Sequence, residues 1–471
     1  MNITTLASLA GGRSRGAAVA LGAVWLIAAG SACSGLLDVK NPNNVSADSL
    51  NNATAGFAIA NGAQAALAYG WGAILTEYAT VTDELTWSGS RDGFRELDVG
   101  TLLNPTNEFT DAAFPFVGRA RWMADLAIKK LAGFDAAGTI KDRNDLARSY
   151  LYGAIAYTMI GDNFNNFPIG SDMRQAAAPL GRAKMDSVYK VAIAYATTGL
   201  AIAQATGSTS LQVALTAMRA RAEHAKGVWT LIHPVGPGVP TGGNALVIDA
   251  AAGADARAAI TLADGAAKSP DWKFRFNYSP TTVDNYIGAW VNGRQEMRFG
   301  DRFVNRAAKD TLRDPVSVAV APPGAVDPEI RRAVVEFVGK PATQSYQPLT
   351  ALSERELHLI LAEAALASGD TIGPTSGFAV HINYRRALDG MLAYNPANAA
   401  HPRPLVMLMY ERQVNVFLQG RRLQDLYRFG IRADNWQAGT DAVGAPGTLF
   451  PITQVELLAN SYCVANVASC Q

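Results

Sequence analysis

Charged and metal-binding side chains are scarce in this sequence. Lysine, arginine, aspartate and glutamate make up 17% of its 471 residues, and the formal net charge is +1. A nucleic-acid-binding protein carries a basic stripe that neutralises phosphates, so this balance argues against a nucleic-acid partner. The five histidines are scattered and show no metal-ligand spacing. We therefore expect neither a metal site nor a cofactor.

Catalytic signatures are also missing between residues 33 and 471. This part of the chain has no Gly-x-Ser-x-Gly elbow, no His-Glu-x-x-His helix and no phosphate-binding glycine loop. A carboxylate pair for glycoside hydrolysis is recognised by a separation of about 5–10 Å in space, which a sequence does not display. The residues therefore give no support for catalysis, and an anchored glycan hydrolase is the last of the alternatives.

Long hydrophobic runs are absent, and the most apolar stretch stands at the N-terminus. Residues 17–29 are thirteen apolar or small residues, whereas a membrane-spanning helix takes about 20. Arg13 and Arg15 precede this stretch, and small residues lead from it to Cys33. A positive head, a short apolar middle and small residues before a cleavage site are typical of a secretory signal peptide. We expect residues 1–32 to be that peptide.

The four residues that end at Cys33, Gly-Ser-Ala-Cys, are similar to the bacterial lipobox, in which the cysteine is lipidated and becomes the new N-terminus. Ser31 and Ala32 fit its small-residue positions, whereas Gly30 stands where Leu is usual. Acyl chains contribute about 0.8 kcal/mol per buried methylene, so they hold a soluble domain on a membrane without a spanning helix. The sequence predicts a lipid anchor at Cys33; the alternative is ordinary cleavage that leaves a thiol.

Only two further cysteines are present, Cys463 and Cys470, with six residues between them. Outside the cytoplasm such a pair can close a disulfide. We predict this disulfide, which would tie down the C-terminus, and two free thiols are the alternative.

Helical periodicity dominates the rest of the chain. A Gly- and Pro-rich breaker at 233–243 separates two helical regions, and residues 270–350 look irregular, with short strands at 273–278 and 332–338. We expect helices at 46–75, 108–131, 142–160, 182–206, 211–230, 253–268, 353–368, 378–393, 403–419 and 421–429.

Two of these helices resemble each other. Residues 146–162 and 356–370 both end in Gly-Asp and carry alanines at the same distances from that end. We expect Gly161 and Gly369 to be left-handed helix caps, and the alanines to let a neighbouring helix approach closely. Recurring helix–turn–helix units of this kind indicate a tetratricopeptide-type array, although any set of antiparallel helix pairs would look similar.

Residues 411–430, "ERQVNVFLQGRRLQDLYRFG", carry a resemblance to a known family. The segment resembles the C-terminal signature of SusD/RagB-like outer-membrane lipoproteins, which has a Glu-Arg start, an aromatic residue before a Gly-x-Arg turn, and Asp-Leu-x-Arg-x-Gly. These places are held by Glu411, Arg412, Phe417, Gly420, Arg422, Asp425, Leu426, Arg428 and Gly430. Three other segments, 33–43, 359–370 with Glu363, and 450–460, resemble further parts of the family pattern and follow in its order.

The resemblance implies a mostly α protein, a tetratricopeptide-type helix-pair scaffold with irregular ligand-binding loops. It implies one SusD-like nutrient-binding domain over residues 33–471, with a loop-rich insert at about 270–350. Members of the family are lipid-anchored in the outer membrane of the cell and face the exterior. They bind glycan or peptide oligomers and deliver them to a TonB-dependent, SusC-like transporter, and the resemblance implies that this chain is likewise a binding protein and not an enzyme. The alternative that we keep is a helical-repeat lipoprotein that scaffolds outer-membrane assembly.

Sugars are bound by flat aromatic faces, with polar side chains that reach the hydroxyls. Two loop segments combine both kinds of residue, so they supply our candidate ligand contacts, although packing in a core or loop is the alternative for each. The candidates are Asp83, Trp87, Arg91, Trp272, Tyr278, Tyr286 and Trp290. The motif at 411–430 we interpret as scaffold, with Glu411, Arg422, Asp425 and Arg428 in an ion-pair network between two helices.

Overall fold

The computed structural model describes residues 49–170, 176–234, 245–266, 270–300, 303 and 346–470. The predicted signal peptide, Cys33 and the predicted strand at 332–338 lie outside these residues. The chain divides into two compact units, Met1–Asn52 and Ala53–Gln471. The first contributes one described turn, η1 (Ser49–Asn51), and the fold below is that of the second.

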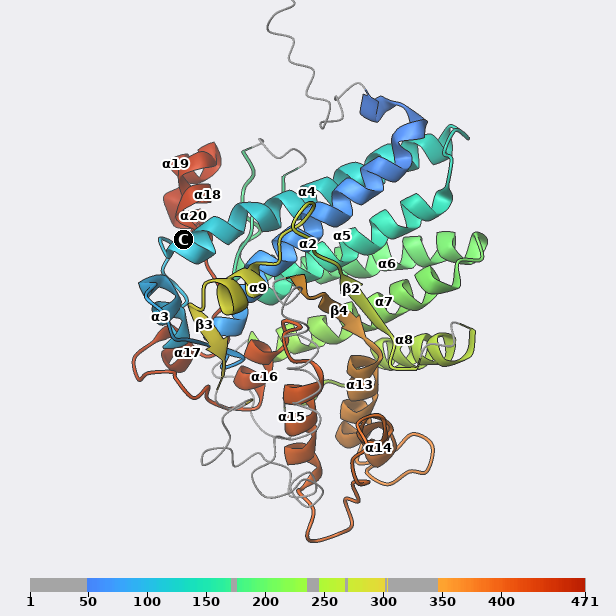
Figure 1. The fold of residues 1–471 in the computed structure, drawn as a ribbon, viewed down its shortest axis with the longest axis vertical. Coiled ribbons are helices and arrows are strands. Elements are labelled where there is room, and N and C mark those ends of the chain that lie inside the picture. The colour runs from blue at the N-terminus through green and yellow to red at the C-terminus, as the bar shows by residue number, and fades with distance from the viewer. Residues whose placement is uncertain are drawn as a thin grey trace, which may run out of the picture. The chain divides into compact units, whose positions relative to one another are not determined.

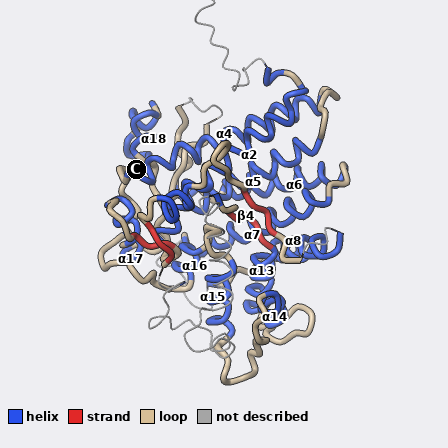
Figure 2. The backbone as a smooth tube through the Cα atoms, in the orientation of Figure 1, coloured by secondary structure: helices blue, strands red, loops and turns tan. Residues whose placement is uncertain are grey.

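Long helices make up the first half of this unit (Figures 1 and 2). Each helix packs against the next along the chain, from α2 with α4 to α7 with α8, which is the pairing expected of a tetratricopeptide-type array. The mostly helical fold class is therefore confirmed. The elements are η2 (Ala53–Ala55), α2 (Gly56–Val81), β1 (Leu85–Trp87), α3 (Asp92–Asp98), α4 (Glu108–Ala136), α5 (Arg143–Asn163), η3 (Arg182–Lys184), α6 (Ser187–Ala205), α7 (Thr209–Ile232), α8 (Ala250–Thr261) and the π-turn η5 (Leu262–Ala266).

Side-chain caps explain where several helices begin. Asn107 accepts hydrogen bonds from the N–H groups of the first turn of α4, and Asp142 and Asp249 do the same for α5 and α8. Each satisfies backbone donors that have no partner inside the helix. The sequence predicts these starts to within a few residues because the cap residue directly precedes an apolar pattern.

The Gly161 prediction is wrong, whereas the Gly369 prediction is right. Gly369 has a φ of +80° and ends a helix in the left-handed conformation. Gly161 lies inside α5, which continues to Asn163. A Cβ atom at Gly161 would lie 2.5 Å from Tyr189 Cζ of α6, so glycine is needed there for close packing rather than for a cap.

The second half joins short strands to shorter helices (Figure 2). In the described residues β1 pairs with β3 and β2 pairs with β4, both antiparallel. Helix α13 packs against α8, α14 and α15, so the second helical region continues the first. These elements are β2 (Lys273–Phe276), α9 (Tyr286–Gly288), the π-turn η6 (Ala289–Gly293), β3 (Met297–Phe299), β4 (Leu349–Ser353), α13 (Glu354–Ala367), α14 (Phe378–Leu388), α15 (Pro404–Asn415) and α16 (Arg422–Arg428).

Four short helices close the chain: α17 (Asp441–Gly444), α18 (Gln454–Ala459), α19 (Ser461–Ala465) and α20 (Val467–Cys470). A disulfide joins Cys463 and Cys470, and α18 packs against α4 (Figure 1). Within the described part of the chain, no helix has both the length and the apolar character needed to cross a bilayer.

Candidate functional site

Two of the candidate ligand residues come together with rings from the long helices. Tyr286 begins α9, and its ring meets Tyr69 of α2 edge-on at 5.4 Å and Phe116 of α4 at 6.5 Å. Tyr69 and Phe116 are themselves edge-on at 4.6 Å. All three side chains are half-buried, so each keeps part of its area in contact with solvent.

Trp290, in η6, rests on a buried aromatic pair. Phe94 of α3 and Phe109 of α4 stack at 3.5 Å, and the indole of Trp290 meets them edge-on at 5.1 and 5.3 Å. The Arg294 guanidinium lies over the indole, 4.8 Å from the ring centroid. Trp290 is also half-buried. We call the four half-buried rings, Tyr69, Phe116, Tyr286 and Trp290, the aromatic surface.

Trp87 and Arg91 are both connected to the segment that follows Trp290. The backbone N–H groups of Ser90 and Arg91 donate to the Glu296 carboxylate at 2.6 and 3.0 Å, and Glu296 N–H donates to the Trp290 carbonyl at 3.0 Å. The hydrogen bonds that the Glu296 carboxylate accepts, above all that from the Ser90 backbone, lower the pKa of Glu296. Trp87 ends β1, which is paired with β3, so two distant loops meet here.

The exposure of Trp87 and Arg91 differs. Trp87 is half-buried, and its indole Nε1 is buried without a hydrogen-bond partner among the described residues. Arg91 is exposed and stands directly before α3. Arg91 therefore presents its side chain to solvent, whereas the indole Nε1 of Trp87 does not.

Asp83 was a candidate ligand contact, but its carboxylate lies inside the protein. Arg422 of α16 binds both of its oxygens, at 3.0 and 3.1 Å, and the residue is 5% exposed. Its neighbour Glu84 is also buried, and burial raises the pKa of that carboxyl to about 8, although Leu418 N–H and Arg422 oppose the shift. Asp83 therefore belongs to the scaffold and not to a ligand surface.

Tyr278 and Trp272 also have structural partners. The hydroxyl of Tyr278 donates to the Ala68 carbonyl at 2.9 Å, and its side chain is buried against α2, which corrects its assignment as a ligand contact. Trp272 is half-buried. Its backbone exchanges hydrogen bonds with Glu354 at the start of α13, so it joins β2 to that helix. Neither residue belongs to the aromatic surface.

A pocket that the sequence did not indicate opens on the other side of Phe116. Its volume is about 370 Å³, and it lies between α4, the segment after α5, and α18. Phe114, Phe116 and Phe167 supply its aromatic walls, and Arg119, Arg121 and Glu456 its charged groups. Because these residues come from three separate parts of the chain, the only sequence signal was the Phe-Pro-Phe run at 114–116 inside a helix.

The motif at 411–430 forms a buried ion-pair network that includes the predicted pair of Asp425 and Arg428, whereas other partners lie outside the motif. Glu411 binds Arg385 and Arg386 of α14 instead of the charges of α16. Asp425 accepts hydrogen bonds from Arg412 at 2.8 Å and Arg428 at 2.9 Å. All six side chains are almost completely buried.

Glu363 joins this network to the earlier helices. Its carboxylate contacts Arg428, and His224 of α7 lies at 3.0 Å from its other side. Burial alone would raise the pKa of Glu363, but Arg428 and His224 outweigh it and hold that pKa well below its usual value. These charges are enclosed and mutually neutralised, so they set the geometry of the helices rather than bind a ligand.

The fold is that of SusD superfamily proteins. A SusD superfamily protein from Parabacteroides distasonis ATCC 8503 matches with a TM-score of 0.57 and 13% identity, over 89% of this chain and 98% of that chain. One from Bacteroides vulgatus ATCC 8482 matches with a TM-score of 0.56 and 13% identity, over 87% and 97%. A SusD-like carbohydrate-binding protein from Bacteroides fragilis NCTC 9343 matches with a TM-score of 0.53 and 12% identity, over 80% and 87%. No protein-family model and no curated protein sequence matches the chain.

Proposed function

We propose that this chain is a SusD/RagB-type lipoprotein that binds glycan oligomers outside the outer membrane and delivers them to a TonB-dependent, SusC-like transporter. The observation that carries the proposal is the agreement of the fold with SusD superfamily structures over 87% and 89% of the chain. The motif at 411–430 and the lipobox-like segment that ends at Cys33 support it from the sequence.

The aromatic surface is our proposed ligand contact. A pyranose ring presents a face of C–H groups that packs on an aromatic ring, and Trp and Tyr add a polar edge that hydrogen-bonds to hydroxyls. Trp290 and Tyr286 have both features, with Trp87 and Arg91 beside them. An oligosaccharide therefore fits this surface through its C–H faces and its hydroxyls.

We propose that the protein binds its ligand without turnover. Glycoside hydrolysis requires two carboxyl groups that flank the ligand. The carboxylates nearest in sequence to Trp87, those of Asp83 and Glu84, are buried and bonded to Arg422 and to the Leu418 N–H. We therefore propose that the protein is not an enzyme.

The direct test measures binding of glycans to the mature chain, residues 33–471 with Cys33→Ser. We expect saturable binding of at least one neutral oligosaccharide from a panel of α- and β-linked hexose and pentose oligomers, measured by calorimetry. Trp290→Ala should weaken it by about tenfold or more, since removal of a buried aromatic anchor typically costs 2 kcal/mol or more.

The matched control is Phe57→Ala, because Phe57 also carries an arginine over its ring, Arg148 at 4.9 Å, but is exposed on α2. It should leave the affinity unchanged. Urea unfolding of both variants separates lost binding from lost folding. If no oligosaccharide binds and an outer-membrane assembly protein is captured instead, the scaffold alternative replaces this proposal.

A further inference from the structure

The pocket beside Phe116 has three aromatic walls and an unequal set of charges. Phe114 and Phe167 are buried and stacked at 4.7 Å, and Phe116 is half-buried and belongs also to the aromatic surface. The charged side chains are those of two arginines and one glutamate. A volume of about 370 Å³ falls within the range of small-ligand sites, about 300–1,000 Å³.

Arg121 is held against the pocket by a fixed set of partners. Its Nη1 donates to Asp125 at 3.1 Å and to the carbonyl of Gly170, whereas its Nε is buried without a partner among the described residues. The hydroxyls of Tyr157 and Tyr195 donate to Asp125 at 3.0 and 2.9 Å. The Asp125 carboxylate and the Arg121 guanidinium are therefore held in one arrangement at the wall of the pocket.

Arg119 lies one helical half-turn away and is exposed at the pocket. No ion pair to it is found among the residues that the structure describes. An unpaired guanidinium beside aromatic walls favours a ligand with a carboxylate, because the two make charge-assisted hydrogen bonds, often in a bidentate arrangement.

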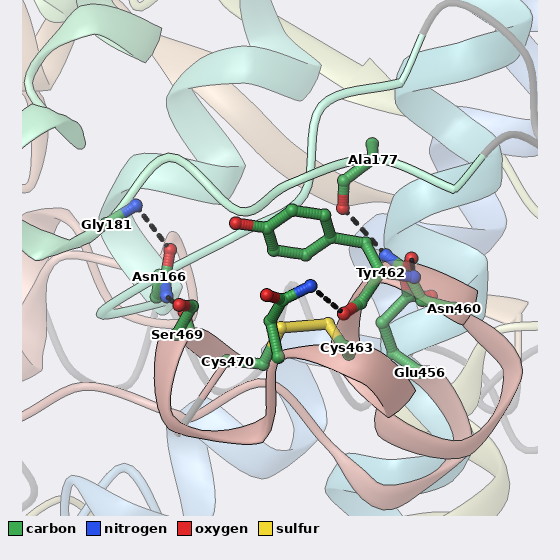
Figure 3. Close-up of a disulfide and its surroundings, with 10 residues drawn as sticks. Asn166, Ala177, Gly181, Glu456, Asn460, Tyr462, Cys463, Ser469 and Cys470 are labelled. Atoms are coloured by element: carbon green, nitrogen blue, oxygen red, sulfur yellow. Dashed lines mark hydrogen bonds between the residues drawn. A yellow bond between two sulfur atoms is a disulfide. The ribbon is translucent and has the colours of Figure 1, made fainter.

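Two further lining residues, Ala177 and Glu456, are held by Asn460 in the C-terminal region (Figure 3). The side-chain amide of Asn460 donates to the Glu456 carboxylate at 2.9 Å and to the Ala177 carbonyl at 2.8 Å, and both acceptors belong to residues that line the pocket. The disulfide between Cys463 and Cys470 closes the helices that follow. Glu456 thus faces the pocket as a positioned acceptor.

We propose that this pocket binds an acidic sugar unit, a hexuronate, at the end of an oligosaccharide that crosses the aromatic surface. The inference rests on the proposed glycan-binding function and specifies its ligand class. A uronate ring carries a carboxylate for Arg119 and Arg121, hydroxyls that donate to Glu456, and a C–H face for the phenylalanines. Phe116 is shared by the pocket and the aromatic surface.

The experiment compares two trisaccharides that differ only in the oxidation state of C6, trigalacturonate and galactotriose, on the mature chain with Cys33→Ser. We expect trigalacturonate to bind about tenfold more tightly, because charge-assisted hydrogen bonds are about twice as strong as neutral ones. Arg119→Gln should remove most of that preference. Lys129→Gln removes the same charge from an exposed position farther along α4 and should leave the preference unchanged.

The outcomes separate this inference from the function on which it rests. Equal affinity for the two trisaccharides, or a preference that Arg119→Gln does not alter, overturns the acidic subsite while glycan binding stands. Binding of a tripeptide with a free C-terminus that Arg119→Gln abolishes, with no binding of either sugar, overturns it in favour of a peptide site. Absence of binding by every oligosaccharide tested removes the glycan function and the subsite together.

Discussion

At the scale of single residues, the most consequential groups are charges enclosed between helices. Asp425 lies between Arg412 and Arg428, and all three side chains are nearly inaccessible to solvent. Removing one member of such a set leaves an uncompensated charge in a medium of low polarity. The arginines on either side of Asp425 therefore depend on it as much as it depends on them.

Asp425→Asn should lower the free energy of unfolding by about 3–5 kcal/mol, the usual result of breaking a buried ion pair from one side. The substitution keeps the shape of the side chain, so the loss reports the charge. Urea denaturation followed by circular dichroism measures it.

Asp92→Asn is the matched control, because its pair with Arg95 lies on the surface, with side-chain exposures of 83% and 55%. It should change stability by less than about 1 kcal/mol. Equal effects of the two substitutions would show that Asp425 is not an ion-pair partner in solution.

The positions of the candidate ligand residues show that the local sequence does not predict which side chains are buried by distant segments. A polar loop with a tryptophan predicted Trp87 and Arg91, and an aromatic cluster predicted Tyr286 and Trp290, and the structure leaves these four side chains at least partly open to solvent. The same reasoning failed for Asp83, because its partner Arg422 stands 339 positions away in the chain. The residues around Asp83 in the sequence do not indicate that a distant segment buries it.

At the scale of elements, small residues decide how closely helices approach. A Cβ at Gly161 of α5 would lie 2.5 Å from Tyr189 and 2.8 Å from Val188, whereas a Cβ at Gly133 of α4 would meet nothing within 4 Å. Both glycines lie inside helices with ordinary φ values. They form a matched pair of helical glycines, because atoms of a neighbouring helix lie close to Gly161 and none lie close to Gly133.

Gly161→Ala should therefore destabilise the protein by about 1–3 kcal/mol through overpacking, and Gly133→Ala should stabilise it by about 0.5–1 kcal/mol through the lower backbone entropy of the unfolded chain. The opposite signs are the prediction, and thermal unfolding of the two variants measures them. Two changes of the same sign would contradict the packing account of Gly161.

The long helices were predictable because their caps and apolar faces are local. Asn107 and Asp142 mark the starts of α4 and α5 in the sequence itself. The strands β1 and β3 were not predicted, because each has three residues and exists only through its pairing with the other. The pocket was not predicted either, because Phe167 and Glu456 are distant from α4 in the sequence and come close to it only in the folded protein.

At the scale of the whole molecule, the proposal needs a protein that is retained at a membrane by its N-terminus. Cys33→Ser should release the mature protein from the membrane fraction into the soluble fraction, because the helices described here provide no spanning segment. Fractionation with mass spectrometry of the N-terminal peptide tests this. Unchanged membrane association of the variant, or an unmodified Cys33 in the parent, would refute the anchor.

The partners of Asp83 and of the first helix come from the last eighth of the chain. Tyr78 accepts a hydrogen bond from Leu423 N–H, and the Trp436 indole donates to the Val81 carbonyl, across 345 and 355 positions. Forming contacts between segments so far apart in the chain is slow. The first helix therefore completes these hydrogen bonds only after the last eighth of the chain has been made.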